Sequence, residues 1–227
     1  KTLKADGNII INNGNNTISS TDDGIKSETS ITINGGNTLI SKATEGIEAK
    51  TITINGGNTN ITASDDGVNT TASTQAGGTE SNDGSYLYMN GGVLTAVATS
   101  GDAIDSNGTI LMTGGVMVGF GPSNSTNEDI DANGTITING GLLFGGCMNS
   151  GMFESISSSA QVGVNLKSTS AVSTASGFIQ IKDANGTVIG TFKTPLAYYY
   201  FHLSSPDMKV STAYSIYTGG TYTGGST

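Results

Sequence analysis

The acidic residues of this sequence recur at fixed places, and they are the groups best suited to chemistry. Fourteen of the 18 Asp and Glu residues lie between Asp22 and Asp131, in phrases such as DDGI, EGIE, DDGV and EDID. Aligning these phrases on their aliphatic residue puts most of the charges in two positions. Two residues before the aliphatic residue come Asp23, Glu45, Asp66, Asp102 and Glu128, and one residue after it come Lys26, Glu48, Asn69, Asp105 and Asp131.

A second repeated phrase predicts the scaffold that holds these residues. ITINGG and its variants begin at residues 9, 31, 52, 87, 110 and 136, so the repeats are 22, 21, 35, 23 and 26 residues apart. A period near 20 residues is typical of a solenoid, and the longer spacings indicate insertions, chiefly around residues 71–85. The leucine pattern and helical segment of leucine-rich repeats are missing.

Each repeat divides into three short strands and three turns. "ITI" alternates an inward Ile with an outward Thr, and "NGG" forms a corner because these residues tolerate positive φ. A second strand (TLI, TNI, VLTAV) and a third strand that contains the aliphatic residue of the acidic phrase complete the coil. We therefore expect an all-β fold, a right-handed single-stranded parallel β-helix of about six coils over residues 1–156.

Equivalent positions in successive coils are expected to stack. Three interior columns are predicted: Ile31, Ile52, Leu87, Ile110 and Ile136; Ile33, Ile54, Met89, Met112 and Ile138; and Ile25, Ile47, Val68, Ile104 and Ile130. At the corner, Asn12, Asn34, Asn55, Asn90 and Asn139, interrupted by Thr113, are expected to form a structural ladder of side-chain amides.

From about residue 157 the repeat ends, and residues 157–227 are predicted to form a C-terminal β cap. The segment FIQIKDANGTVIGTF (178–192) has alternating apolar arms around DANGT, which is typical of a hairpin. A cap is expected because the last coil of a solenoid otherwise exposes its core and a free strand edge.

The stacking of acidic residues needs a compensating charge. Neighbouring coils are about 4.8 Å apart, so adjacent carboxylates repel by about 1 kcal/mol in water and by more where solvent is partly excluded. Ca²⁺ binds oxygen ligands at about 2.3–2.6 Å and fits between such coils. Asp65, Asp66 and Asn69 are the central candidate ligands, between Glu45 and Glu48 of one coil and Asp102 and Asp105 of the next; Glu128 and Asp131 continue the columns. Turn preference alone also explains Asp and Asn here, but it does not explain their registry.

Composition restricts the possible partners. The formal net charge is −9 and all nine basic residues are lysines, which disfavours nucleic acid and anionic membranes as partners. Cys147 is the only cysteine, so neither an intramolecular disulfide nor a cysteine metal site is expected. No run of about 18 apolar residues predicts a membrane span, and no signal peptide is expected in this segment.

The β-helix with stacked Ile and Asn turns resembles the pectate-lyase-like superfamily. ITINGG coils combined with DDGI, EGIE and DGVN turns resemble a family of secreted bacterial carbohydrate-binding β-helix proteins over about residues 7–156. The resemblance implies calcium binding and non-catalytic recognition of plant cell-wall polysaccharide, notably polygalacturonate (pectin) and possibly cellulose. The positions that it implies as sites are Asp22, Asp23, Asp65, Asp66, Asp102, Asp105, Asp129 and Asp131.

An enzyme is the alternative. Pectate lyases of this fold use calcium and typically an arginine base, and this chain has no arginine. Paired aspartates such as Asp65 and Asp66 suit hydrolysis in principle, but the His and Arg-Lys motifs of polygalacturonases are missing. His202, the only histidine, is expected to be structural. We therefore expect a non-enzyme, with a calcium-dependent pectate-lyase-like enzyme as the alternative.

Outward aromatic residues are candidates for neutral sugar chains. Tyr86 and Tyr88 replace outward Ser and Thr residues of the other coils, and flat rings stack on sugar rings. Coverage of this pair by the 71–85 insertion is an equally open interpretation. Tyr198, Tyr199, Tyr200 and Phe201 are expected to pack in the cap. We expect a protein that is secreted or displayed at the cell surface, and an adhesin or cell-wall spacer is a further alternative.

Overall fold

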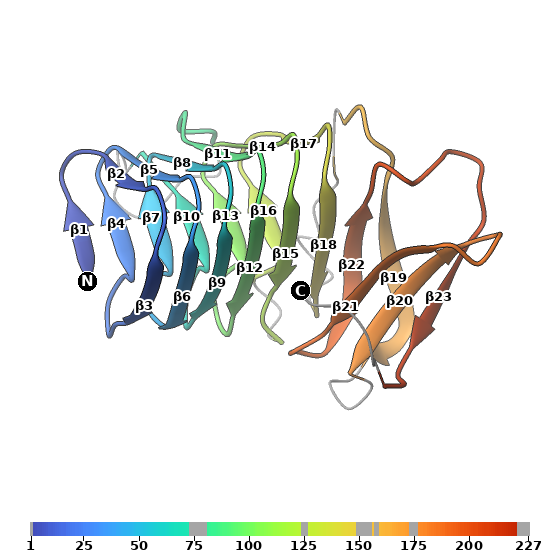
Figure 1. The fold of residues 1–227 in the computed structure, drawn as a ribbon. Coiled ribbons are helices and arrows are strands. Elements are labelled where there is room, and N and C mark those ends of the chain that lie inside the picture. Colours follow the sequence, from blue (N-terminus) through green and yellow to red (C-terminus); the bar gives the residue numbers. More distant parts are fainter. Residues whose placement is uncertain are drawn as a thin grey trace.

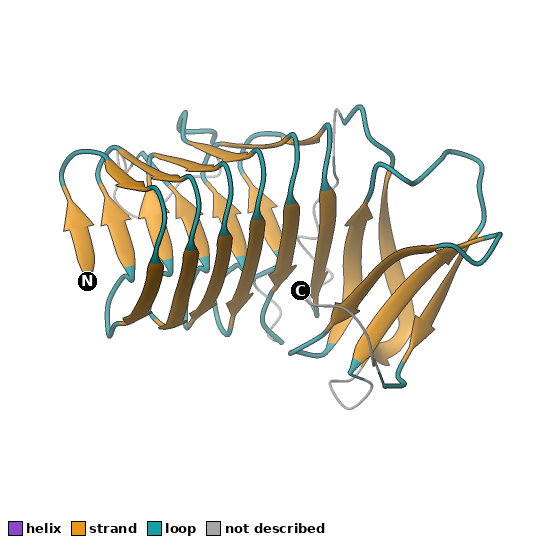
Figure 2. Ribbon diagram, viewed as in Figure 1, coloured by secondary structure: helices purple, strands orange, loops and turns teal. Residues whose placement is uncertain are grey.

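The structure is a computed structural model that describes residues 2–72, 81–123, 127–148, 156, 159–172 and 177–221. Every regular element among these residues is a β-strand (Figure 2). The predicted all-β solenoid of about six turns is confirmed. None of the described residues forms a helix of the length and hydropathy that crossing a membrane requires.

Three parallel sheets form the walls of the solenoid, and each coil contributes one strand to each sheet (Figure 1). We call these sheets A, B and C in the order in which the chain passes through them. In Figure 1 each coil runs upward in sheet A, crosses the top in sheet B and runs downward in sheet C, so the solenoid is right-handed. Sheet A contains β1 (Leu3–Ala5), β4 (Ile25–Ser27), β7 (Ile47–Ala49), β10 (Val68–Thr70), β13 (Ile104–Ser106) and β16 (Ile130–Ala132). Sheet B contains β2 (Ile9–Ile11), β5 (Ser30–Ile33), β8 (Thr51–Ile54), β11 (Tyr86–Met89), β14 (Thr109–Met112) and β17 (Ile136–Ile138). Sheet C begins with β3 (Asn15–Ser19), β6 (Asn37–Lys42), β9 (Asn58–Ala63), β12 (Val93–Ala98), β15 (Val116–Phe120) and β18 (Leu142–Cys147).

The predicted interior columns are confirmed by the strand register. Ile31 pairs with Ile52, Ile52 with Leu87, and the column continues through Ile110 to Ile136. The Ile33 and Ile25 columns are in register in the same way, and their members are at most 1% exposed. Burial of such side chains stabilises the fold by about 1.5–3 kcal/mol each, so these columns are the main stabilising element of the solenoid.

The NGG corner adopts the predicted positive φ at its second glycine, as at Gly36 (φ 82°) and Gly57 (φ 80°). A Cβ at Gly57 would lie 2.5 Å from the carbonyl oxygen of Gly36 in the coil before, so close stacking of the corners also requires glycine. Of the predicted insertion around residues 71–85, residues 73–80 lie outside the described residues.

The Asn ladder is confirmed for its first five positions. The side-chain amides of Asn34, Asn55 and Asn90 each donate to the Oδ1 of the preceding Asn, at 2.8, 2.9 and 3.0 Å, and the first acceptor is Asn12. Thr113 continues the ladder, because its Oγ1 donates to Asn90 Oδ1 at 2.9 Å.

The C-terminal segment extends and covers sheet C (Figure 1). Strands β22 (Tyr198–Ser204) and β19 (Gly163–Val172) add to β18 in antiparallel order. The predicted hairpin is confirmed as β20 (Phe178–Asp183) and β21 (Val188–Lys193), and β23 (Tyr214–Thr218) completes a three-stranded sheet D.

A second hydrophobic core joins sheet D to the outer face of sheet C. Phe144 of β18 stacks on Phe192 of β21 with centroids 4.1 Å apart, and Val118, Phe120, Ile179 and Ile181 are buried in the same cluster. Tyr198 and Phe201 are 0% and 4% exposed here, as expected for aromatic residues that pack in the cap. The cap therefore covers a side wall of the solenoid as well as its end.

We expect Asn55→Ala to lower the free energy of unfolding by about 1–2 kcal/mol, because it removes two ladder hydrogen bonds of about 0.5–1.5 kcal/mol each. Asn12→Ala is the matched control, since Asn12 stands at the end of the ladder and takes part in one such bond. Urea denaturation measures the free energy of unfolding of both variants. Equal losses for Asn55→Ala and Asn12→Ala would contradict a continuous ladder.

Candidate metal and carbohydrate site

The strand register stacks the acidic residues on the outer face of sheet A. The N–H groups of Gly24, Gly46 and Gly67 each donate at 2.9 Å to the carbonyl oxygen of the acidic residue one coil further on, namely Glu45, Asp66 and Asp102. Glu48, Asn69, Asp105 and Asp131 are likewise paired between β7, β10, β13 and β16. We call these two rows the acidic columns.

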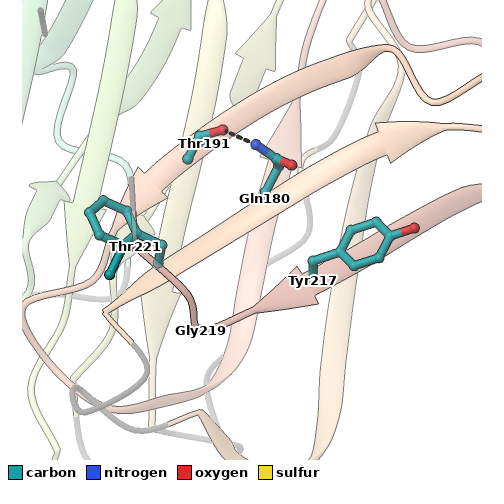
Figure 3. Close-up of a pocket in the computed structure, with 6 residues that line it drawn as sticks. Gln180, Thr191, Tyr217, Gly219 and Thr221 are labelled. Carbon is teal, nitrogen blue, oxygen red and sulfur yellow. Dashed lines mark hydrogen bonds between the residues drawn. The ribbon is translucent and has the colours of Figure 1, made fainter. Parts of the chain in front are cut away.

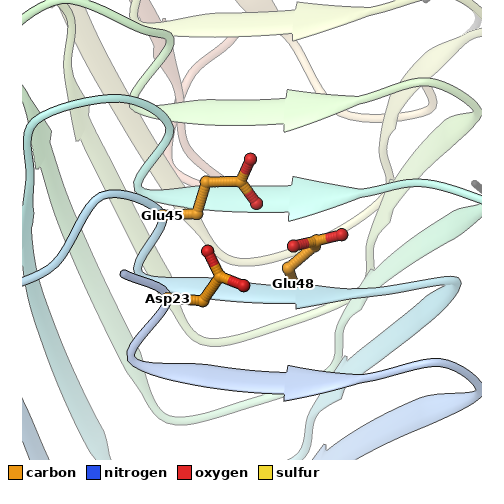
Figure 4. Close-up of side chains that lie close together, drawn as sticks. All are labelled: Asp23, Glu45 and Glu48. Atoms are coloured by element: carbon orange, nitrogen blue, oxygen red, sulfur yellow. The ribbon is translucent and has the colours of Figure 1, made fainter. Parts of the chain in front are cut away.

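The first coils bring Asp23, Glu45 and Glu48 together, and we call this group the N-terminal triad. Carboxylate oxygens of the three residues lie within 4.8 Å of one another, and Figure 4 shows them converging on the outer side of sheet A. Lys26 provides a positive charge at this point: its Nζ donates to both Glu48 oxygens, at 2.6 and 2.5 Å, and lies 3.7 Å from Asp23 Oδ2. The protein therefore supplies its own cation to the N-terminal triad.

A second group, the C-terminal triad, consists of Asp102, Asp105 and Asp131. Oxygens of these carboxylates also lie within 4.8 Å of one another, and all three side chains are half-buried. Asp66 adjoins the triad, because its Oδ1 accepts a hydrogen bond from the backbone N–H of Asp102 at 2.8 Å. Asp102 Oδ1 in turn accepts from the N–H of Glu128. No lysine occurs in the sequence between Lys50 and Lys167, the stretch that contains all three residues of this triad.

Burial raises the pKa of four carboxyl groups in the columns, and neighbouring carboxylates raise it further. The pKa is about 9 for Glu45, where a hydrogen bond with Glu48 contributes, and about 9 for Asp105. It is about 8 for Asp102 and about 6 for Asp66, where backbone hydrogen bonds partly oppose the increase. Glu45 is among the charges that raise the pKa of Asp105, so the two triads interact electrostatically.

Two buried oxygens between and beside the triads have no hydrogen-bond donor. They are Asn69 Oδ1, on a side chain that is 9% exposed, and Glu45 Oε2. Asn69 stands in register between Glu48 and Asp105. A buried acceptor without a donor costs about 1–3 kcal/mol, which a bound cation would offset. The donor set contains only carboxylate and amide oxygens, which suits a hard cation such as Ca²⁺.

Several predicted ligands lie outside the two triads. Asp22 and Asp65 are exposed and stand on the adjoining turn, where the carbonyl of Asp22 accepts from Thr44 N and the carbonyl of Thr44 accepts from Asp65 N. Glu128 is only 1% exposed and belongs to neither triad. The structure thus brings together Asp23, Glu45, Glu48, Asp66, Asn69, Asp102, Asp105 and Asp131 from the predicted set.

Asp129 faces the interior and pairs with the histidine of the cap. His202 Nδ1 lies 2.8 Å from Asp129 Oδ2, and both side chains are at most 1% exposed. Asp129 occupies the position directly before a strand of sheet A, where the other coils have small residues: Gly24, Gly46, Gly67 and Ala103. Its carboxylate therefore occupies interior space that side chains of sheet C fill in those coils. Burial and the adjacent Asp129 carboxylate also raise the pKa of the Cys147 thiol. Asp129, Cys147 and His202 therefore form a buried polar group at the end of the solenoid. The raised pKa keeps the Cys147 thiol protonated.

Tyr86 and Tyr88 stand side by side on the outer face of sheet B. Their rings are parallel within 5°, with centroids 5.4 Å apart, and Tyr86 is 38% exposed. Tyr88 pairs with Thr53 and Leu111 of the adjacent strands. The pair presents an aromatic surface, and the central part of the insertion that we considered as its cover lies outside the described residues.

One comparison with known proteins gives a functional description. A family model described as "Carbohydrate-binding domain-containing protein" matches residues 1–46, which include β1 to β6 and the residues Asp23, Lys26 and Glu45. No curated protein and no solved structure matches the chain. The match supports carbohydrate binding, with a polysaccharide as the corresponding partner.

The raised pKa values predict that the metal-free protein loses stability as the pH rises. An acid whose pKa is higher in the folded state binds its proton more tightly when the protein is folded. This proton binding contributes fully to the free energy of unfolding below about pH 4, and the contribution is lost between about pH 4 and pH 9. In chelator we expect the free energy of unfolding to be at least roughly 2 kcal/mol lower at pH 8 than at pH 5. Urea denaturation at the two pH values measures this, and equal stability would contradict the raised values.

Gly145→Ala tests the buried pair without touching its members. A Cβ at Gly145 would lie 2.0 Å from Asp129 Oδ2, so the methyl group must displace the carboxylate from His202. We expect a loss of about 1–3 kcal/mol in the free energy of unfolding, because two buried polar side chains lose their hydrogen bond to each other. Gly7→Ala is the control, since nothing lies within 4 Å of its Cβ. A Gly145→Ala variant as stable as the control would show that the pair is dispensable.

Proposed function

We propose that this protein is a non-catalytic carbohydrate-binding protein that holds acidic polysaccharide through calcium bound at the acidic columns. The observation that carries the proposal is the C-terminal triad, in which oxygens of three half-buried carboxylates lie within 4.8 Å of one another, next to the buried Asn69 Oδ1 that has no hydrogen-bond donor. The family match over residues 1–46 supports the carbohydrate-binding part of the proposal.

The residues that would hold Ca²⁺ are Asp102, Asp105 and Asp131, with Asp66 and Asn69 of the preceding coil. Their oxygens fit a cation that takes six to eight oxygen ligands, and the orphaned Asn69 Oδ1 gains a partner by such binding. When bound, calcium supplies the positive charge that attracts a sugar carboxylate to an otherwise acidic protein. The N-terminal triad is the weaker candidate, because Lys26 already neutralises Glu48 there.

The partial exposure of the C-terminal triad supports a binding role. Asp66, Asp102, Asp105 and Asp131 are all half-buried, so one side of the group faces solvent. A sugar carboxylate can approach from that side, while the stacked coils hold the protein oxygens in place. Polygalacturonate carries one carboxylate per sugar unit, so a linear row of sites along sheet A would suit it. We propose pectin-like plant cell-wall polysaccharide as the partner.

Tyr86 and Tyr88 give the proposal a second part, the binding of a neutral chain such as cellulose. Their parallel rings on sheet B support it, because aromatic faces pack against the C–H faces of sugars. We further propose that the protein acts outside the cell or on its surface. Calcium sites of extracellular modules work at about 10⁻⁴–10⁻³ M, and a site built from aspartate carboxylates and one amide on an open face suits that range.

Replacement of the triad carboxylates tests the calcium dependence. The double change Asp102→Asn and Asp105→Asn keeps the side-chain volumes and removes two charges, and we expect it to reduce calcium-dependent retention on polygalacturonate at least about tenfold. Asp207→Asn is the matched control, because Asp207 is an exposed acid on the cap. Retention is compared in millimolar calcium and in EDTA, and the calcium-induced rise in melting temperature is measured for each variant.

Retention of the wild type that is equal in calcium and in EDTA would exclude calcium-dependent binding. The same incubations are followed at ultraviolet wavelengths for unsaturated sugar products. Product that appears with the wild type and is lost in the double variant would favour the calcium-dependent pectate-lyase-like enzyme instead. We expect retention without product, because the chain has no arginine to serve as the base.

A further inference from the structure

A shallow pocket lies on the outer face of sheet D, on the side away from the second hydrophobic core. It has a volume of about 140 Å³ and is lined by Phe178, Gln180, Thr191, Tyr217, Gly219 and Thr221. Figure 3 shows Gln180 and Thr191 on neighbouring strands, with Tyr217 on the strand beyond. Pockets for drug-sized ligands are about 300–1,000 Å³, so this one suits a single ring of a longer molecule.

Strand alternation explains why these residues share one face. In β20, Ile179 and Ile181 enter the core at 0% and 1% exposure, so Phe178, Gln180 and Lys182 project outward. Cross-strand pairing adds neighbours on the same face: Lys193 opposite Phe178, and Thr191 and Tyr217 on either side of Gln180.

The pocket combines an aromatic face with fixed hydrogen-bonding groups. Tyr217 is 55% exposed, so its ring is accessible to a ligand. Gln180 Nε2 donates to Thr191 Oγ1 at 2.9 Å. This bond orients the amide, whose carbonyl oxygen remains an acceptor, and the Thr191 hydroxyl keeps its hydrogen as a donor. An aromatic face beside a donor and an acceptor matches the C–H face and hydroxyl groups of a sugar ring.

The charge of this face distinguishes it from the solenoid. Lys182 Nζ lies 5.4 Å from the centroid of the Tyr217 ring, and the exposed Lys193 is the cross-strand partner of Phe178. Two of the nine basic residues of the chain thus flank one small pocket. The nearby acid, Asp183, is engaged in its own turn, where its Oδ1 accepts from the N–H groups of Asn185 and Thr187. The face is therefore complementary to a negatively charged ligand.

We propose that the outer face of sheet D is a second carbohydrate site, which binds one acidic sugar unit directly and without a metal ion. The sugar ring packs on Tyr217, its hydroxyl groups bond to Gln180 and Thr191, and its carboxylate pairs with Lys182. The proposal rests on the proposed function for the class of polymer, but it uses neither calcium nor the acidic columns.

The experiment is affinity electrophoresis of the whole chain in gels that contain polygalacturonate and EDTA, at about 0.15 M salt. The Debye length is then about 8 Å, so the distant acidic columns repel the polymer only weakly. We expect retardation of the wild type that falls about tenfold in apparent affinity in Tyr217→Ala and several-fold in Lys182→Gln. Tyr217→Phe keeps the ring and retains most of the affinity, and Lys50→Gln, on the solenoid, is the matched charge control.

Three results would overturn the proposal: no retardation of the wild type in EDTA, retardation that neither Tyr217→Ala nor Lys182→Gln reduces, or an equal effect of Lys182→Gln on retardation by polygalacturonate and by a neutral glucan. Failure of the proposed calcium function is a different result, because it appears as no gain on adding calcium and leaves the EDTA measurement unchanged. Tyr217 is exposed and Lys182 is half-buried, and the melting temperatures of both variants show whether the fold is retained.

Discussion

The constraint on which the rest of this structure depends is the parallel register between successive coils. Because backbone N–H groups bond to carbonyl groups of the neighbouring coils, equivalent positions are repeated at a spacing of about 4.8 Å. The repetition is favourable for Ile31 above Ile52 and for Asn34 above Asn12, where like side chains pack or hydrogen-bond. It is unfavourable for Asp105 beside Asp131, where like charges are held together. The same hydrogen bonds therefore stabilise the interior and concentrate charge on the surface, and the surface tolerates it because the interior columns contribute far more.

The two triads differ in how that charge is neutralised. At the N-terminal triad, Lys26 donates two hydrogen bonds to Glu48, so the protein contains the counter-charge within one pair of coils. Asp105 stands in the same column, two coils further on, with Asn69 between it and Glu48. At this position Asn69 has a neutral amide oxygen, where Glu48 and Asp105 have carboxylates. The column thus passes from an internal salt bridge, through an amide, to a group of three carboxylates.

The sequence predicted those features that repeat, because repetition reveals which residues share a column. The Ile columns, the Asn ladder and the alignment of Asp23, Glu45, Asp66 and Asp102 follow from the period alone. The pairing of Asp129 with His202 could not be found in this way, since the partners are 73 residues apart and His202 lies in the part of the chain that does not repeat. A weaker signal existed: Asp129 stands where other coils have Gly or Ala. The covering of sheet C by sheet D also left a signal, because the outward column Thr17, Leu39, Asn60, Thr95, Val118 and Phe144 becomes apolar towards its end.

That change of polarity explains why the outer face of sheet D differs in charge from the acidic columns of the solenoid. The outward residues of β15 and β18 require an apolar cover, and Ile179, Ile181 and Phe192 of sheet D provide it. Since strand residues alternate, burying Ile179 and Ile181 obliges Phe178, Gln180 and Lys182 to face solvent. The cap therefore presents a face whose composition is independent of the repeat, and lysine and tyrosine can gather there at little cost. An acidic solenoid with the proposed calcium sites and a cap with the proposed basic, aromatic site would contact one polyanion in two chemically different ways. Such a protein would hold the polymer in the presence of calcium through both faces, and in its absence through the cap alone.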